Sequence, residues 1–170
     1  TDSATTADPH AGNNSGSAPT PLGAANADLA ITISDGGPTV HIGPGGRIGG
    51  FSITDGTGDF GAGMVVLGSG TVIEGNIFRN NAQGAGGFGA AIGGNSSSPT
   101  IRGNVFKQNT CDGQFLSGVV SFVNSSSPRI ENNIFEDNPC RAINLTLPAE
   151  NQPQIVNNTI VRNPTGIRLD

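Results

Sequence analysis

The sequence has no tryptophan and no tyrosine, a single lysine, and charged side chains at only 12% of its 170 residues. Its basic residues are scattered singly, so no basic patch is available for phosphate contacts and no nucleic-acid partner is expected. No apolar run approaches the ~18 residues that a membrane-spanning helix needs, so no membrane span is expected. The lack of Trp and Tyr counts against a sugar-binding site, because such sites commonly use those rings. No helical period of 3.6 residues appears anywhere.

What the sequence does contain is a repeat with the pattern I-x-x-N-x-F-x-x-N. It occurs in four copies, which a degenerate fifth copy precedes (Ile48, Phe51, Ile53 and Gly56). The leading isoleucines are Ile48, Ile73, Ile101, Ile130 and Ile155, with steps of 25, 28, 29 and 25 residues. A repeat of this length with short β-like runs is typical of a solenoid.

Each repeat shows three short strand-like runs that turn residues separate. The runs of two successive repeats are Ala90–Gly94, Thr100–Arg102 and Val105–Lys107, then Val119–Val123, Arg129–Glu131 and Ile134–Glu136. In both repeats the turn N-S-S-S-P follows the first run. Three short strands per coil, stacked on equivalent strands above and below, indicate a parallel β-helix.

The apolar and amide positions of the motif each have a structural interpretation. The Ile and Phe side chains are expected to point into the coil and to stack in columns about 4.8 Å apart, the strand spacing. Each Asn falls at a bend, where its amide can bond the same amide in the next coil and where left-handed backbone is tolerated. The sequence therefore predicts two Asn ladders and not ligands. They are Asn76, Asn104, Asn133 and Asn158 at the first bend, and Asn81, Asn109, Asn138 and Asn163 at the second.

This pattern resembles the right-handed parallel β-helix repeat of the pectin-lyase-like superfamily. Phe78–Asn81, Phe106–Asn109 and Phe135–Asn138 also match the F-x-x-N motif of polymorphic outer-membrane adhesins, and Gly89–Ile92 looks like their companion motif G-G-A-I. The resemblance implies an all-β, right-handed parallel β-helix (solenoid) of about five coils over residues 29–170, with three short strands per coil. Its members include polysaccharide lyases, hydrolases, epimerases, adhesins and phage tailspikes, so the fold alone does not choose a function.

Residues 1–28 are Thr, Ser, Ala, Asn, Pro and Gly with almost no large apolar side chain. Such a segment cannot by itself bury enough surface to offset its ordering entropy. It is expected to be an extended arm or linker, unless a contact elsewhere holds it. The chain begins at Thr1 without Met or a signal peptide, as expected of either a processed mature form or an excised piece.

In the enzymes that the chain resembles, acidic, calcium-binding and basic residues usually lie on the outer face of one sheet. Counting back from the N-S-S-S-P turns registers the strands of that sheet. Its outward residues come out as small or apolar until the last coil, and they include Val65, Leu67, Val120 and Phe122. Because this face offers no carboxylate pair for acid–base or metal chemistry, the sequence predicts no catalytic residue and no metal ligand.

Asp55 and Asp59 in T-D-G-T-G-D are the remaining candidate for a cofactor. Two such aspartates can hold Ca²⁺ in a turn, although turn aspartates are more commonly only turn residues. His10 lies in the arm and His41 in the first coil, so the two histidines indicate no metal site.

The two cysteines hold the same place in adjacent coils, because Cys111 follows Asn109 by two residues and Cys140 follows Asn138 by two. About one strand spacing therefore separates them, which is within disulfide range. A bridge there would contribute roughly 3–4 kcal/mol in the chain-entropy model and indicates an oxidising compartment. A stacked pair of free thiols is the alternative.

Three functions remain compatible with the sequence. The favoured hypothesis is a secreted or cell-surface structural or adhesive protein, extracellular in location. The others are a carbohydrate-active enzyme, or a fragment of one, and a non-catalytic carbohydrate-binding module. Polysaccharide remains a possible ligand, but Arg79, Lys107 and Glu136, which share one outward position in consecutive coils, fit a solvated charge ladder better than sugar binding.

The partner expected first is a second copy of the chain. Ile167 and Leu169 begin a coil that no capping segment covers, and an uncovered coil recruits another chain. Head-to-tail pairing with the strands near Leu29–Ile33 of the next copy would yield filaments. The alternative is that the chain was cut from a longer β-helix. The expected contact surface comprises Val65, Leu67, Val120, Phe122, Ile167 and Leu169.

Overall fold

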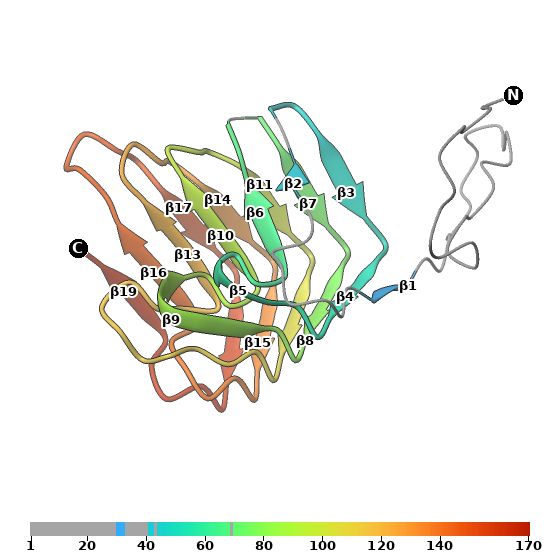
Figure 1. Ribbon diagram of the computed structural model, residues 1–170. Coiled ribbons are helices and arrows are strands. Elements are labelled where there is room, and N and C mark those ends of the chain that lie inside the picture. The colour runs from blue at the N-terminus through green and yellow to red at the C-terminus, as the bar shows by residue number, and fades with distance from the viewer. Residues whose placement is uncertain (1–29, 33–40, 43, 69) are drawn as a thin grey trace, which may run out of the picture.

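The structure is a computed structural model that describes residues 30–32, 41–42, 44–68 and 70–170. In these residues the chain winds as a β-solenoid of stacked coils (Figure 1). The arm predicted for residues 1–28 lies outside the described residues, as do Leu29 and Ile33.

Three parallel sheets, named A, B and C here, run the length of the solenoid. Sheet A contains β1 (Ala30–Thr32), β4 (Ser52–Thr54), β8 (Ile77–Arg79), β12 (Val105–Lys107), β15 (Ile134–Glu136) and β18 (Thr159–Val161). Sheet B contains β2 (His41–Ile42), β6 (Met64–Val66), β10 (Ile92–Asn95), β13 (Val120–Val123), β16 (Ile143–Thr146) and β19 (Ile167–Leu169). Sheet C contains β3 (Arg47–Gly49), β7 (Val72–Glu74), β11 (Thr100–Arg102), β14 (Arg129–Glu131) and β17 (Gln154–Val156). The predicted parallel β-helix is thereby confirmed.

A fourth, two-stranded sheet stands apart from these three. It pairs β5 (Thr57–Phe60) with β9 (Ala82–Phe88), and its register shifts between Gly58 and Phe60. Both strands belong to loops that connect sheet A to sheet B.

The interior is filled by columns of apolar side chains, with one inward residue per strand in sheets A and C and two in sheet B. The column from sheet A contains Phe78, Phe106 and Phe135, whose rings stack with centroids 5.0 and 4.6 Å apart. These separations match the strand spacing, so the repeated Phe gains a ring contact in each added coil. Sheet C contributes a column of buried Ile to the same core, made of Ile73, Ile101 and Ile130.

The eight asparagines of the motif form two ladders along the solenoid. In the first, Asn104 Nδ2 donates to Asn133 Oδ1 at 3.0 Å and to the Ile73 carbonyl oxygen at 2.9 Å. In the second, Asn109 Nδ2 donates to Asn138 Oδ1 at 3.0 Å. Backbone N–H groups donate to the same Oδ1 atoms, so the ladders satisfy buried polar groups at both bends.

The degenerate first repeat lacks both amides but still joins the ladders. The backbone N–H groups of Phe51 and Gly56 donate to Asn76 Oδ1 and Asn81 Oδ1, at 3.1 and 3.0 Å. A Cβ on Gly56 would collide with the Ala62 carbonyl oxygen, so an asparagine would not fit there.

The predicted register of one strand in sheet B is wrong. Val120 and Phe122 were expected to face outward, but both are fully buried, since they pair with the inward residues Ile92 and Gly94. The two connections that contain the N-S-S-S-P turns differ in length by one residue. Asn95 pairs with Val123 and Thr100 pairs with Arg129, so the second connection has one residue more between these paired positions. Because side chains alternate between the two faces of a strand, this shift by one residue turns the side chains that were predicted to face outward into the interior.

The reason for the observed register is the ring of Phe122. Gly94, in the coil below, has no side chain, and a Cβ there would collide with that ring. Phe122 therefore fills interior space that Gly94 leaves, and a buried Phe is worth more there than on the surface. Val120 and Phe122 thus drop out of the predicted contact surface, and Val65 and Leu67 remain.

Candidate functional site

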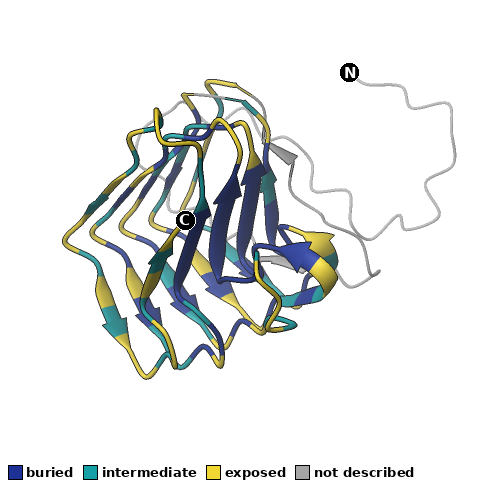
Figure 2. Ribbon diagram, turned by 90° about the vertical axis from the view of Figure 1, so that its left-hand side faces the viewer, coloured by how far each residue is buried: buried dark blue, intermediate teal, exposed yellow. Residues whose placement is uncertain are grey.

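The outer face of sheet B is covered over much of its length, unlike the outer faces of sheets A and C. All four residues of β13 are buried, as are the first three of β16. In Figure 2 strands that are dark blue along most of their length stand out from strands whose colours alternate. The loops between sheets A and B supply this cover.

Gly93 shows how closely these loops lie on the sheet. Its side-chain position faces outward, and a Cβ there would lie 2.7 Å from the Gly61 nitrogen and 2.8 Å from the Phe88 carbonyl oxygen. Gly61 N–H donates to that same carbonyl at 2.9 Å. Only glycine fits under the loops at this position, since the colliding atoms are backbone.

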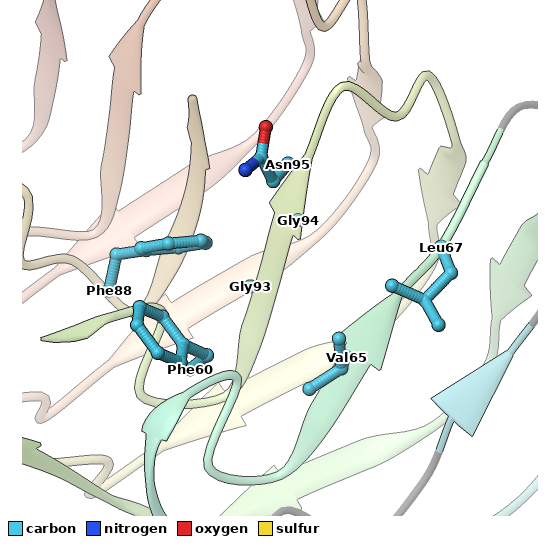
Figure 3. A pocket seen from close by; sticks show the side chains of 7 residues that line it. All are labelled: Phe60, Val65, Leu67, Phe88, Gly93, Gly94 and Asn95. Carbon is cyan, nitrogen blue, oxygen red and sulfur yellow. The ribbon is translucent and has the colours of Figure 1, made fainter. Parts of the chain in front are cut away.

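Beside Gly93 the cover ends and an apolar hollow of about 260 Å³ opens. Its lining consists of Phe60, Val65, Leu67, Phe88, Gly93, Gly94 and Asn95 (Figure 3). The Phe60 and Phe88 rings meet edge to face with centroids 5.1 Å apart. Phe88 is 8% exposed, whereas Phe60 and Leu67 are 52% and 47% exposed. A buried ring thus supports an exposed one at the mouth of the hollow.

Asn95 is the polar group of this lining. Its Oδ1 accepts hydrogen bonds from Asn124 Nδ2 at 2.9 Å and from the Ser96 hydroxyl at 3.1 Å. Its Nδ2 has no partner among the described residues. The hollow therefore offers apolar walls and one amide donor at the rim.

A buried polar cluster holds the covering loops together. Gln83 Nε2, from β9, donates to Asp112 Oδ1 at 2.9 Å and to Ser117 Oγ at 2.8 Å. Asp112 Oδ2 accepts from the Gly86 N–H at 2.6 Å, and Oδ1 accepts from the Ser117 hydroxyl. The carboxylate of Asp112 thus ties β9 to the loop that follows Cys111 in the next coil.

The pKa of Asp112 reflects this role. Burial by itself raises the pKa of the carboxyl, but hydrogen bonds from the Ser117 hydroxyl and from the N–H groups of Gln114 and Gly86 outweigh it. The net pKa lies below its ordinary value. Because the charged form accepts all these bonds, the cluster is tightest when Asp112 is ionised.

The disulfide between Cys111 and Cys140 lies at the base of the same loops. It joins equivalent positions of adjacent coils, with Cα atoms 5.8 Å apart, so the alternative of free thiols does not apply. Cys111 directly precedes Asp112, so the bridge anchors the loop that Asp112 organises.

The outward column of sheet B next to the cover is polar toward the last coils. By register it contains His41, Val65, Gly93, Ser121, Asn144 and Arg168. Arg141 donates to Asn144 Oδ1 at 3.1 Å and to the Ser117 carbonyl oxygen at 2.9 Å. The pKa of Arg141 is lowered, and burial is the largest cause. Arg168 pairs with Asp170 and lies 3.9 Å from the Phe115 ring centroid. This column presents no pair of carboxylates.

The other predicted candidates are spread over the molecule. Asp55 follows β4 in a left-handed turn with φ 59°, and Asp59 lies in β5. Within the described part of the chain no three His, Cys, Asp or Glu side chains come together as a possible metal site. His41 lies in β2, whereas His10 lies outside the described residues.

The last coil exposes the apolar pair predicted there. Ile167 and Leu169 continue the inward columns of Ile143 and Leu145, and they are 45% and 62% exposed. A hollow of about 240 Å³ opens between Leu169 and the segment Leu147–Pro153.

The Phe60–Phe88 pair and the Asp112 cluster were not found from the sequence. The repeat lengths did indicate additional loop residues, because the steps of 28 and 29 residues exceed the steps of 25 by three and four residues. Three of the extra residues in each step lie in the loops after Asn81 and Asn109, where the covering segments are built, and the fourth in the longer step lies in the turn after β13.

The part of the chain that the structure describes contains no helix long and apolar enough to cross a membrane.

Comparison with known proteins agrees with this architecture. The family model described as the right-handed beta helix region matches residues 30–170. No curated protein and no solved structure matched the chain. Because the match spans all of the described residues, the chain belongs to the right-handed β-helix family.

Proposed function

We propose that this β-helix domain is a non-catalytic, extracellular adhesive protein whose binding surface is the apolar hollow beside Gly93. The observation that carries the proposal is the exposure of Phe60 and Leu67 around a recess that rigid backbone shapes. Exposed apolar recesses of this kind mark binding sites. The disulfide supports an oxidising, extracellular setting.

The lining favours an apolar side chain of a protein ligand over a sugar. A sugar ring needs several hydrogen-bonding partners, and the side chains of this hollow offer only the amide of Asn95. One apolar side chain of a peptide fits a volume of about 260 Å³. The Nδ2 of Asn95 then donates to a carbonyl oxygen of the peptide backbone.

The outward column of sheet B supports a binding role over catalysis. By register the column holds one imidazole residue, His41, and no carboxylate, so it lacks the pair of groups that general acid–base catalysis commonly uses. Asp170, two residues beyond Arg168 in the last coil, is ion-paired with Arg168.

Panning a random-peptide phage library tests the binding surface. The wild-type chain is the target, and the double variant Phe60→Ser/Leu67→Ser is the counter-target. Enriched peptides are expected to share an aromatic or large aliphatic residue and to lose at least tenfold in affinity on the double variant. The variant Ile77→Ser is a matched control, because Ile77 is 46% exposed but lies on sheet A. Peptides that bind the double variant equally well would refute the assignment of the hollow.

The non-catalytic part has its own test. Incubation with polygalacturonate, alginate and chitin oligomers, with and without Ca²⁺ at Asp55 and Asp59, is expected to release no product. Appearance of new reducing ends or unsaturated uronates would replace the adhesive function with the enzyme hypothesis.

A second candidate function is head-to-tail self-association, and the exposure of Ile167 and Leu169 favours it. Among the described residues, the outermost strands of sheets A, B and C are β1, β2 and β3 at one end of the solenoid and β18, β19 and β17 at the other. Such edges pair with further strands. For this 170-residue chain, sedimentation is expected to show species whose mass increases with protein concentration. Leu169→Asp should abolish this increase. Equal sizes for both chains would exclude this mode of assembly.

A further inference from the structure

The outer face of sheet A carries an aliphatic stripe, made of Ile77, Val105 and Ile134. The three residues are in register on β8, β12 and β15. Ile77 and Ile134 are 46% and 42% exposed, and Val105 is half-buried. Ser52 and Thr159 continue the same column at its two ends.

Sheet C shows that such a stripe is not the default for an outer face of this solenoid. The first residues of its strands, which are the equivalent positions, are mixed in character: Val72, Thr100 and Arg129. The third residues of the same strands are charged: Glu74, Arg102 and Glu131. Arg102 lies 2.7 Å from Glu74, and Arg129 pairs with Glu131 at 2.5 Å. Both outer faces thus carry a charged column, but only in sheet A is the other outward column a contiguous run of aliphatic side chains.

Over the five strands from β4 to β18, this column of sheet A has the same order of residue types in both directions. It is polar, Ile, Val, Ile, polar, with Val105 at the centre, and Ala30 of β1 lies beyond Ser52. A two-fold axis parallel to the strands and passing over Val105 would lay this face on that of a second copy. Ile77 then meets Ile134 of the partner subunit, and Val105 meets its own equivalent.

The second outward column of sheet A makes the same pairing electrostatically favourable. It contains Arg79, Lys107 and Glu136 in successive coils. Lys107 bonds Glu136 at 3.0 Å, but Arg79 has no ion pair among the described residues. The two-fold axis brings Arg79 of each copy opposite Glu136 of the partner subunit. At the centre the two Lys107 side chains meet, each neutralised by Glu136 and Asp137 at 3.0 and 3.8 Å.

We infer that sheet A is a self-association surface, through which two copies of this chain dimerise with their solenoid axes antiparallel. The face spans six strands of three residues each, which is roughly 29 by 10 Å, or on the order of 300 Å² for each copy. This is less than half the area that each partner of a standard interface buries, so the dimer is weak and is expected only at protein concentrations approaching about 1 mM.

The test is a mixing experiment by sedimentation equilibrium with Arg79→Glu and Glu136→Arg. Each variant alone opposes like charges twice per dimer, and its dimerisation is expected to weaken about tenfold relative to wild type. An equimolar mixture restores two opposite-charge pairs in a heterodimer, and its association is expected to return to within about threefold of wild type. A structural defect in either variant would not be repaired by mixing, so failure of the rescue overturns the inference.

A matched pair of lysine variants tests the stripe itself. Val105→Lys places two cations at the centre of the interface and is expected to leave the chain monomeric. Thr100→Lys adds the same charge to the same coil on sheet C and is expected to dimerise as wild type does. Equal behaviour of the two variants contradicts a contact through sheet A.

Leu169→Asp separates this inference from head-to-tail association. The antiparallel dimer is closed and lies away from the last coil, so this variant is expected to leave it unchanged. Loss of the dimer in Leu169→Asp would assign the self-association to the ends of the solenoid instead.

Discussion

The outer faces of sheets A and B show how one repeat builds two different surfaces. Sheet A follows the repeat on both faces, with Phe78, Phe106 and Phe135 inside and a regular register of outward residues. Sheet B keeps its inward columns, but loops of unequal length fold over its outer face. The repeat therefore makes the interior the same in successive coils, and the loops between sheets A and B make the outer surfaces differ.

This difference has a thermodynamic consequence. Residues on the interior columns contact equivalent residues in two neighbouring coils, so a substitution there disturbs the packing of those coils as well. The covering loops contact sheet B through a few specific residues, namely Gly93, Asp112 and the disulfide. Substitutions in the two regions should therefore differ in size and in what they disturb.

The largest effect is expected in the interior, from Phe106→Ala. The ring stacks between Phe78 and Phe135, and its removal leaves a cavity that should lower the free energy of unfolding by about 3–5 kcal/mol. Urea unfolding followed by circular dichroism measures the change. Ile77→Ala, on the outer face of the same sheet, is the control and should cost within about 0.5 kcal/mol. Similar losses in both variants would remove the distinction between interior and surface.

Reduction of the disulfide is expected to have the next largest effect. Cys111 and Cys140 close a loop of 29 residues, so Cys111→Ser/Cys140→Ser should lower stability by about 3–4 kcal/mol through the entropy of the unfolded chain. Thermal unfolding of the variant, and of wild type with and without reductant, provides the measurement. The reductant should leave the variant unchanged, and an effect on it would point to a cause other than this bridge.

Gly93→Ala tests how closely the loops lie on sheet B. The new methyl group would meet backbone atoms of Gly61 and Phe88, so a loss of about 1–3 kcal/mol is expected, with faster hydrogen exchange in β5 and β9. At Gly166 an added Cβ meets nothing closer than 4.0 Å, which makes Gly166→Ala the control. A stable Gly93→Ala protein with unchanged exchange would show that the cover is looser than described.

The smallest effect is a pH dependence from Asp112. Its folded-state pKa is lowered, so its contribution is fully present above the unfolded-state pKa of about 3.8 and is lost as pH falls through the folded-state value. Asp112→Asn should therefore cost about 1 kcal/mol at pH 7, and the difference from wild type should shrink below pH 4. Chemical unfolding of both proteins from pH 7 to pH 2.5 tests this. A constant difference across that range would mean that the charge of Asp112 plays no part.

The sequence by itself determined most of what repeats. The bounds of Thr100–Arg102, Val105–Lys107 and their equivalents followed from motif spacing, and so did the stacked Phe column and the pairing of Cys111 with Cys140. The physical reason is that each coil contacts the next in register. Residues one repeat apart are therefore neighbours, and periodicity in sequence becomes adjacency in space.

Only the tertiary structure decided the surfaces of sheet B. The extra residue in one turn reversed the faces of β13, and no count along the chain shows which turn absorbs a residue until Phe122 is packed beside Gly94. Likewise Gln83 reaches Asp112 and Ser117 across 29 and 34 residues, and these positions are outside the repeated motif. Such contacts depend on the path of individual loops, so they exist only once the solenoid beneath them has formed.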